Sequence, residues 1–314
     1  MRTAFIKQLV EEAAINDKIF LIVGDLGYSV VEMFAEKYPE RFLNAGIAEQ
    51  NMIGVAAGLA KEGYNVYVYS IGNFPTLRCM EQIRYDVAYH NLNVKIVSVG
   101  AGYAYGSLGA SHHATEELGM MRTIPNMVIC SPGDPVEAQV ISTVSANYEG
   151  PMYLRLGKAG EVIVHQSLIE NLKIGDLIPV IRKPNANKAL LVSGSILDYA
   201  VNRIREFNDL SDVYSIPFVK PLNIEQLHEL AIQYPDICVL EEHQKSCGVG
   251  SAIIEVINDM YSRSEIPYYP RIKRIAIDDK FYSVSGSQAY LRKLANLVSV
   301  SYTHLRAHET AANL

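Results

Sequence analysis

Glu49 is the residue whose type and position most clearly suggest chemistry in this sequence. It begins a predicted helix whose following residues, 52–60 (MIGVAAGLA), are apolar. The helix dipole favours a carboxylate in the first turn, and this alone explains many such acids. A carboxyl beside so apolar a helix is also partly desolvated, which favours its protonated form. The pattern therefore predicts either an ordinary first-turn acid or a carboxyl that can hold a proton next to a ligand.

Other polar segments follow predicted strands. They are 24–29 (GDLGYS), 44–51 (NAGIAEQN), 70–74 (SIGNF), the glycine-rich loop 100–113, and Arg155. Ligands of parallel α/β sheets bind outside the carboxyl ends of the strands. These segments are therefore expected to share one site with Glu49.

Short apolar runs alternate with helical stretches and predict the framework of this site. The predicted strands, each rich in β-branched residues, are 19–23, 65–69, 94–99 and 127–130. Of the predicted helices between them, 3–15 is amphipathic, and 48–61 is apolar nearly all round, as in a buried helix. The alternation predicts an α/β fold with a parallel sheet and helices on both of its faces.

A second, shorter α/β alternation begins after a turn cluster at 183–187 (KPNAN). Its predicted strands are 188–193, 212–216, 236–241 and 272–277, and its predicted helices are 196–208, 223–233, 249–262 and 287–297. We therefore expect a first domain at 1–157, a linker at 158–187 and a smaller α/β domain at 188–300. Residues 301–314 lack apolar periodicity, and we interpret them as a non-native tail.

Composition narrows the classes of protein that fit. The chain has 314 residues, 49% of them hydrophobic, and a net charge of −6. The acidic balance argues against a nucleic-acid partner, and no apolar run is long enough to span a membrane. The N-terminus becomes charged within a turn or two, which predicts no secretory signal. Four widely spaced cysteines fit no zinc or CxxC pattern, so we expect reduced, mostly buried thiols and a cytoplasmic protein.

Residues 46–52 (GIAEQNM), followed by 54–58 (GVAAG), resemble the pyrimidine-binding signature of the transketolase family, whose enzymes use thiamine diphosphate. The same register holds in 24–26 (GDL), 81–84 (EQIR), 109–113 (GASHH), 153–155 (YLR), 220–222 (KPL), 241–243 (EEH) and 248–252 (GVGSA). The resemblance covers about residues 2–298. It implies a pyrimidine-binding domain followed by the family's smaller C-terminal domain.

The resemblance assigns cofactor contacts to four residues. Glu49 would hydrogen-bond N1′ of the aminopyrimidine ring and stabilise its imino tautomer, while the carbanion chemistry belongs to the cofactor. Phe74 would stack on that ring, and Ile71 stands where the family usually has a second aromatic residue. Asp25 would lie near a subunit interface behind the site. Without the resemblance, we would interpret Phe74 as an ordinary core residue.

Substrate contacts follow from the same resemblance. His112 would contact the donor sugar, whereas Arg2, Ser29 and Arg155 match positions that hold the sugar phosphate. A guanidinium suits this task because it binds phosphate through two parallel hydrogen bonds. Two positions depart from the family: Gly100 replaces a phosphate-binding histidine, and Leu108 replaces an acid that reads a donor hydroxyl. We therefore expect an intact cofactor site and an altered substrate site.

One part of the cofactor site is missing from the sequence. The family holds the diphosphate through Mg²⁺, bound by a Gly-Asp-Gly motif and a later asparagine on a separate domain. No Gly-Asp-Gly occurs here, because 24–26 reads Gly-Asp-Leu. The resemblance thus implies the second subunit of a split transketolase, which moves a two-carbon ketol unit from a ketose to an aldose in carbohydrate metabolism. An N-terminal partner subunit would carry the Mg²⁺ ligands, and self-association would complete a heterotetramer.

Three other readings remain beside this one. A 1-deoxyxylulose-5-phosphate-synthase-like carboligase or a 2-oxo acid dehydrogenase β subunit would share the domain that bears Glu49, and Leu108 keeps the first of these open. A non-catalytic assembly or regulatory partner is a reading of another class, against which Glu49 and Phe74 argue. A nicotinamide-binding enzyme is disfavoured because no Gly-x-Gly-x-x-Gly follows the first strand.

Overall fold

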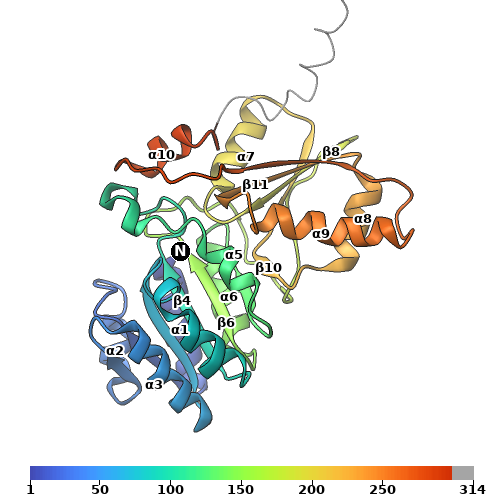
Figure 1. Ribbon diagram of the computed structural model, residues 1–314. Helices are drawn as coiled ribbons and strands as arrows, with labels where there is room; N and C mark the ends of the chain where they lie inside the picture. The colour runs from blue at the N-terminus through green and yellow to red at the C-terminus, as the bar shows by residue number, and fades with distance from the viewer. Residues whose placement is uncertain (299–314) are drawn as a thin grey trace, which may run out of the picture.

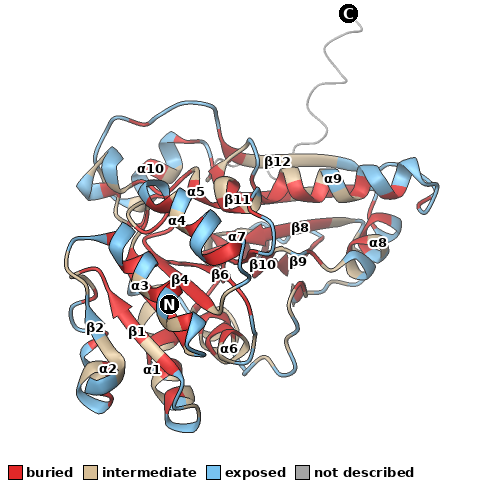
Figure 2. Cartoon of the chain, turned by 60° about the horizontal axis from the view of Figure 1, so that its bottom comes forward, coloured by how far each residue is buried: buried red, intermediate tan, exposed pale blue. Residues whose placement is uncertain are grey.

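Two α/β units, one after the other in the chain, pack side by side (Figure 1). The computed structural model describes residues 1–298, so the tail expected at 301–314 lies outside the described residues. Figure 2 shows that the strands of both units are mainly buried, while exposed residues gather on the outer faces of helices and in connecting loops.

The N-terminal unit is built on a seven-stranded sheet in the order β10-β5-β6-β4-β3-β1-β2. The strands are β1 (Ile19–Val23), β2 (Phe42–Asn44), β3 (Asn65–Ile71), β4 (Val94–Val99), β5 (Val128–Cys130), β6 (Met152–Leu156) and β10 (Phe218–Lys220). The first six are parallel, which confirms the predicted sheet. β10 comes from the later part of the chain and pairs antiparallel with β5, so the second unit contributes a strand to the first sheet.

Helices cover both faces of this sheet, as the alternation predicts. They are α1 (Arg2–Ile15), α2 (Glu32–Lys37), α3 (Glu49–Lys61), α4 (Met80–Gln82), which continues as a π-helix (Ile83–Ala88), α5 (Glu117–Arg122) and α6 (Pro135–Ala146). Along β1, Leu21 faces the apolar cluster formed with α1 and α6, whereas its neighbour Ile22 faces the cluster formed with α3. Because successive side chains of β1 point to opposite faces of the sheet, the strand contributes to both apolar cores.

Helix α3 is not buried all round, contrary to the sequence-based expectation. One side, which includes Met52, Ile53 and Ala56, is fully buried. On the other side Asn51, Gly54 and Gly58 are exposed, and a Cβ added at either glycine would meet nothing within 4 Å. The low polarity of the helix therefore reflects small residues on an open face rather than complete burial within this chain.

The C-terminal unit is built on a five-stranded sheet in the order β12-β11-β8-β9-β7. Its strands are β7 (Ile178–Ile181), β8 (Lys188–Ser193), β9 (Ser211–Ser215), β11 (Asp236–Gln244) and β12 (Arg271–Ile277), and its helices are α7 (Leu197–Glu206), α8 (Ile224–Gln233), α9 (Val249–Ser262) and α10 (Gln288–Leu294). The four predicted strands and four predicted helices of this unit are all present. β7, which is antiparallel to β9, lies within the segment expected as a linker.

A cluster of three buried or half-buried residues fastens the connecting segment to the N-terminus of α6. Asp134 caps the helix through the N–H of Glu137 and also accepts the N–H groups of Val164 and His165. Nε2 of His165 lies 2.8 Å from Oε1 of Glu137. Burial lowers the pKa of His165, but the hydrogen bond to Glu137 and its charge outweigh this, so the pKa is raised. The carboxylate oxygens are thus engaged by the chain itself.

Two observations concern the compartment in which the protein was expected: the state of its cysteines and the character of its helices. All four cysteines are free: Cys79 and Cys130 are buried, whereas Cys238 is half-buried and Cys247 is exposed. Within residues 1–298, no helix has the length and apolar character needed to cross a bilayer.

Candidate active site

Glu49 lies at the first position of α3, where the carboxyl ends of β1, β2 and β3 meet. Its side chain is almost completely buried, with a residue exposure of 2%. Ser70, at the end of β3, directs its hydroxyl towards Oε1 of Glu49 at 3.4 Å. Gly24 lies so near that a Cβ added there would come within 3.7 Å of the carboxyl. The fold therefore places this acid in a tight, buried position at the edge of the sheet where ligands bind.

Arg78 connects the buried carboxyl to the surface. Its Nη1 lies 3.0 Å from Oε2 of Glu49, although 49% of the arginine side chain is exposed. The same guanidinium lies over the ring of Phe74, 4.9 Å from the ring centroid. A flat cation thus engages both a carboxylate and an aromatic face. Arg78 is not among the residues that the sequence patterns singled out, and only its spacing from Phe74 could have suggested it.

A cavity of about 440 Å³ opens beside Phe74 and Arg78. The opposite wall comes from the glycine-rich loop, with Tyr103, Ser111 and His113, and from the 280–282 segment of the C-terminal unit. His112 makes an edge-to-face contact with Phe74 at 5.3 Å, and its Nδ1 lies 3.0 Å from the Ser111 hydroxyl. Predicted cofactor and sugar residues are therefore brought together.

Asp25 and Ile71 lie at neighbouring strand ends. Asp25 follows β1 in a left-handed conformation with a φ of 55°, and its Oδ1 accepts a hydrogen bond from Asn44 at 3.0 Å. Asn44 in turn accepts the N–H groups of Asp25 and Gly46, which fixes the turn that leads into α3. Ile71 ends β3 and is half-buried. Asp25 therefore supports the approach to Glu49 through Asn44.

Arg2 and Ser29 are both close to Glu32. The carboxylate of Glu32 accepts the backbone N–H of Ser29 at 2.8 Å. Hydrogen bonds to Glu32's own backbone N–H and to that of Ser29 lower its pKa, and the charge of Arg2 acts in the same direction. These predicted phosphate contacts thus share a neighbourhood.

Arg155 does not join this group. It is 3% exposed, and its Nε lies 2.5 Å from Oε1 of the buried Glu117. Its Nη2 donates to the carbonyl oxygens of Ala114 and Glu242. Nε and Nη2 of Arg155 are therefore used inside the protein to join the two units, and the expected phosphate contact of this side chain stays a prediction.

The two departures in the substrate loop have different structural settings. Gly100 has a φ of 104°, and a Cβ added there would collide with the ring of Tyr105. Burial raises the pKa of Tyr105, while a hydrogen bond and the charge of Arg2 oppose that effect. Tyr105 therefore fills the space next to Gly100 and places a hydroxyl beside Arg2. Leu108 is 55% exposed on the same loop.

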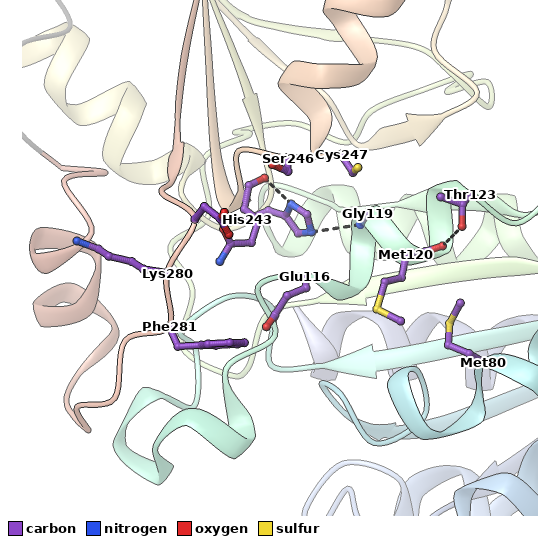
Figure 3. Close-up of a pocket in the computed structure, with 12 residues that line it drawn as sticks. Met80, Glu116, Gly119, Met120, Thr123, His243, Ser246, Cys247, Lys280 and Phe281 are labelled. Atoms are coloured by element: carbon purple, nitrogen blue, oxygen red, sulfur yellow. Dashed lines mark hydrogen bonds between the residues drawn. The ribbon is translucent and has the colours of Figure 1, made fainter.

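A second cavity, of about 570 Å³, lies between the two units (Figure 3). Met80, Met120 and Phe281 provide apolar lining, while His243 reaches it from the end of β11. Nε2 of His243 accepts the N–H of Gly119 at 3.2 Å, and its Nδ1 lies 2.8 Å from the carbonyl oxygen of Gln244. Burial lowers the pKa of His243. His243 is therefore a neutral imidazole with its proton on Nδ1, and it joins the two units through its hydrogen bond with Gly119.

Phe74, which lines the first cavity, and Glu49, which is joined to it through Arg78, fit an aminopyrimidine ring in chemical type. The buried carboxyl of Glu49 is a partner for a ring nitrogen, and the half-buried face of Phe74 is a partner for a flat ring. Arg78 uses these same two features with its own planar donor group. A bound ring would therefore have to displace this guanidinium from both of them.

Both units of the chain match domains of known proteins. Residues 1–160 match the transketolase pyrimidine-binding domain, and residues 183–294 match the transketolase C-terminal domain. A putative transketolase C-terminal section of Methanocaldococcus jannaschii is 33% identical over 292 residues, which are 90% of this chain and 87% of that protein. One of the subunits of an apulose-4-phosphate transketolase of Actinobacillus succinogenes is 31% identical and covers 88% of this chain and 87% of its own length.

Solved structures and longer enzymes complete the comparison. A split-gene transketolase, described as an inactive beta4 tetramer, matches with a TM-score of 0.81 and 32% identity over 95% of both chains. A 1-deoxy-D-xylulose-5-phosphate synthase of Aromatoleum aromaticum is 31% identical over 92% of this chain, which spans 45% of that enzyme. With both domain matches, the chain belongs to the transketolase family and resembles the separate C-terminal subunits of its split members.

Proposed function

We propose that this chain is the second subunit of a thiamine-diphosphate-dependent transketolase that transfers a two-carbon ketol unit from a ketose to an aldose. The observation that carries this proposal is that one guanidinium, that of Arg78, contacts both the buried carboxyl of Glu49 and the half-buried ring of Phe74, and that Phe74 and Arg78 line a cavity. The combination of Glu49 and Phe74 argues against a regulatory partner without catalysis.

The residues of this chain divide the work at the site. Thiamine diphosphate, when bound, supplies the carbanion chemistry. Glu49 holds a proton towards the pyrimidine nitrogen, Phe74 stacks on the ring, and Ile71 contributes apolar surface. His112, which contacts Phe74, offers a polar contact to the donor sugar. Enclosure by the glycine-rich loop keeps water away from the reacting atoms.

A partner chain completes the enzyme. We assign the Mg²⁺ and diphosphate ligands to an N-terminal subunit, because this sequence has no Gly-Asp-Gly motif. The open side of α3, with Gly54 and Gly58 exposed, supports association with further chains. Two copies of each subunit would form a heterotetramer. The free thiols of the chain support a location in the cytoplasm.

The donor is a phosphorylated sugar in this proposal. Arg2 supplies a cation and Tyr105 a hydroxyl on one side of the site, with Ser29 nearby. One relative is named for apulose-4-phosphate, which is consistent with a phosphorylated substrate for this chain. The replacement of an acid by Leu108 suggests a donor other than the family's usual ketoses.

Replacing Glu49 tests the proposal directly. In the complex with the N-terminal subunit, Glu49→Gln should lower kcat at least about 100-fold, because the amide cannot supply the carboxyl proton. Glu62→Gln makes the same chemical change at the exposed end of the same helix and should leave kcat unchanged. Full activity of Glu49→Gln would favour the regulatory role instead.

The partner and the donor can be tested separately. The purified chain should show no ketol transfer alone and should become active with a subunit that carries Gly-Asp-Gly. Product analysis with ketose phosphates and with pyruvate as donors separates ketol transfer from a synthase-like reaction. Turnover of pyruvate, with none of ketose phosphates, would favour the 1-deoxyxylulose-5-phosphate-synthase-like alternative.

A further inference from the structure

The glycine-rich loop that carries His112 and His113 is closed at its base. Gly102 and Ala114 form an antiparallel bridge, with N–H to O distances of 2.8 and 2.9 Å between the heavy atoms. Residues 103–113 therefore form a loop whose two ends lie next to each other. Whatever holds this base sets the position of both histidines.

The end of β11, in the C-terminal unit, holds the base from both sides. Oε1 of Glu242 accepts the N–H of Tyr103 at 2.6 Å, where the loop begins. The N–H of Gln244 donates to the carbonyl oxygen of Thr115 at 2.8 Å, where the loop ends. His243, between them in sequence, binds the N–H of Gly119 further along (Figure 3). Three consecutive residues of one strand thus fix a single segment of the other unit.

The carboxylate of Glu242 is itself firmly placed. Its Oε2 receives the guanidinium of Arg292 at 2.6 Å, and Gln288 donates to it from the same helix, α10. Glu242 is 3% exposed, and a Cβ added at Gly102 would lie 2.5 Å from its Cγ. With a φ of 59°, Gly102 allows the loop backbone to approach the carboxylate this closely.

Contacts continue from this carboxylate into the candidate active site. The ring of Tyr103, whose N–H binds Glu242, meets the ring of His113 edge to face at 5.1 Å. His112 directly precedes His113 in the chain and contacts Phe74 at 5.3 Å. One path from the second unit to the histidines therefore passes through one backbone hydrogen bond and one aromatic contact, while the N–H of Gly286 also donates to the carbonyl oxygen of Gly106 at 3.1 Å.

We propose that Glu242 is a positioning residue, through which the C-terminal unit holds the glycine-rich loop so that His112 is correctly placed for the donor sugar. This inference rests on the proposed function of the loop. It gives the C-terminal unit, to which no catalytic residue is assigned, a defined part in donor recognition.

Glu242→Gln is a sharp test because it keeps the shape of the side chain. A glutamine has one acceptor atom, whereas Tyr103 and Arg292 both require an acceptor at this point. In either orientation, the amide NH2 group faces another donor, which is the N–H of Tyr103 or the guanidinium of Arg292. The hydrogen bond to that residue is then lost. Arg292→Gln is a second variant that loosens the carboxylate without touching the loop.

The neighbouring Glu241 offers a matched control. It is also buried on β11, but its carboxylate accepts the N–H groups of Val249 and Gly250 at the start of α9. Glu241→Gln therefore disturbs an equally buried carboxylate that makes none of these hydrogen bonds to the loop. Burial raises the pKa of Glu241 to about 7, so an amide there is also close to its protonated form.

The experiment combines hydrogen exchange with kinetics on the complex of the full chain and its partner subunit. Glu242→Gln should speed amide exchange in residues 101–114, and Glu241→Gln should speed it only near 249–252. With the loop displaced, kcat/KM for the ketose donor should fall roughly 10- to 100-fold, mainly through KM. The affinity for thiamine diphosphate, which does not involve the loop base, should stay unchanged.

Several outcomes would overturn the proposal. Unchanged exchange in the loop, or faster exchange with unchanged kinetics, would show that Glu242 does not position His112. An equal loss of kcat/KM in Glu241→Gln would show a general effect of destabilising β11. If the wild-type complex is inactive with every ketose donor, the proposed function itself fails, while the exchange measurement still decides whether Glu242 holds the loop. If Glu242→Gln does not fold, Arg292→Gln decides by the same measurements.

Discussion

Nη1 of Arg78 lies 3.0 Å from Oε2 of Glu49, and the same guanidinium covers the ring of Phe74. The carboxyl and the ring that are expected to hold the cofactor are therefore occupied by a side chain of the protein. The arginine side chain is 49% exposed, but that of Glu49 is 1% exposed, so displacing the guanidinium would leave a buried carboxyl that needs another hydrogen-bond partner.

Arg78→Gln should bind thiamine diphosphate more tightly in the assembled enzyme. The pyrimidine ring would no longer have to displace a guanidinium. The Kd for thiamine diphosphate should therefore be about two- to five-fold lower. Calorimetric titration of the cofactor measures this. Arg203→Gln is the control, since Arg203 also stacks on a phenylalanine and pairs with a glutamate, in the other unit. Weaker binding would mean that Arg78 helps to hold the cofactor.

Tyr105→Phe should impair recognition of a phosphorylated donor. The change removes the hydroxyl beside Arg2 but keeps the ring that fills the space next to Gly100. A hydrogen bond to a charged group of this kind corresponds to roughly a 10-fold rise in KM. The KM for an unphosphorylated ketose should not change. Tyr67→Phe, which removes a buried hydroxyl bonded to Ser145, serves as the control. An equal rise in KM for both donors would contradict a phosphate role.

The proximity of Glu49 and Phe74 could be predicted from the sequence because local patterns define it. Glu49 begins a helix after β2, and Phe74 follows β3, the next strand along the chain; both strands are parallel to β1, which lies between them, so their carboxyl ends meet at one edge of the sheet. Arg155 shows where this reasoning stops. Its position at the end of β6 was predictable, but its partners Glu117 and Glu242 come from distant segments, and no local pattern reveals the hydrogen bonds that Nε and Nη2 make with them.

The sequence also did not reveal which side chains fill the space around the site. Gly100 could be recognised as a departure, but nothing in the sequence indicated that the ring of Tyr105 fills the vacant volume. The exposed side of α3 was missed for a related reason. Alanine and glycine have low polarity whether or not another chain covers them, so composition predicted burial where the single chain has an open surface.

Lys95 predicts a pH dependence of stability. This fully buried ammonium donates to the carbonyl oxygens of Tyr148 and Gly150 at 2.8 and 2.7 Å, and burial lowers its pKa to about 7. The unfolded chain holds this proton up to about pH 10.4. Between these values the unfolded state binds more protons, so the free energy of unfolding should rise with pH, by about 2 kcal/mol from pH 7 to 9.

Urea unfolding at pH 7 and pH 9 measures this rise. Lys95→Met removes the titrating group and should lack it, although the variant should be less stable at both pH values because the carbonyl acceptors lose their donor. A rise of the same size in Lys95→Met would assign the effect to other groups.

On the open side of α3, a small added side chain should raise the stability of the separate chain, whereas a large one should weaken its association with another chain. Gly54→Ala and Gly58→Ala should each raise the free energy of unfolding of the separate chain by roughly 0.5–1 kcal/mol, because helical glycine is unfavourable and nothing blocks the added Cβ. Gly54→Leu should also fold, but sedimentation should show weaker association, since a large side chain keeps an approaching backbone away. Glu225→Leu places the same side chain on the exposed first turn of α8 and should associate normally. If both leucine variants associate equally well, the open face of α3 is not where another chain packs.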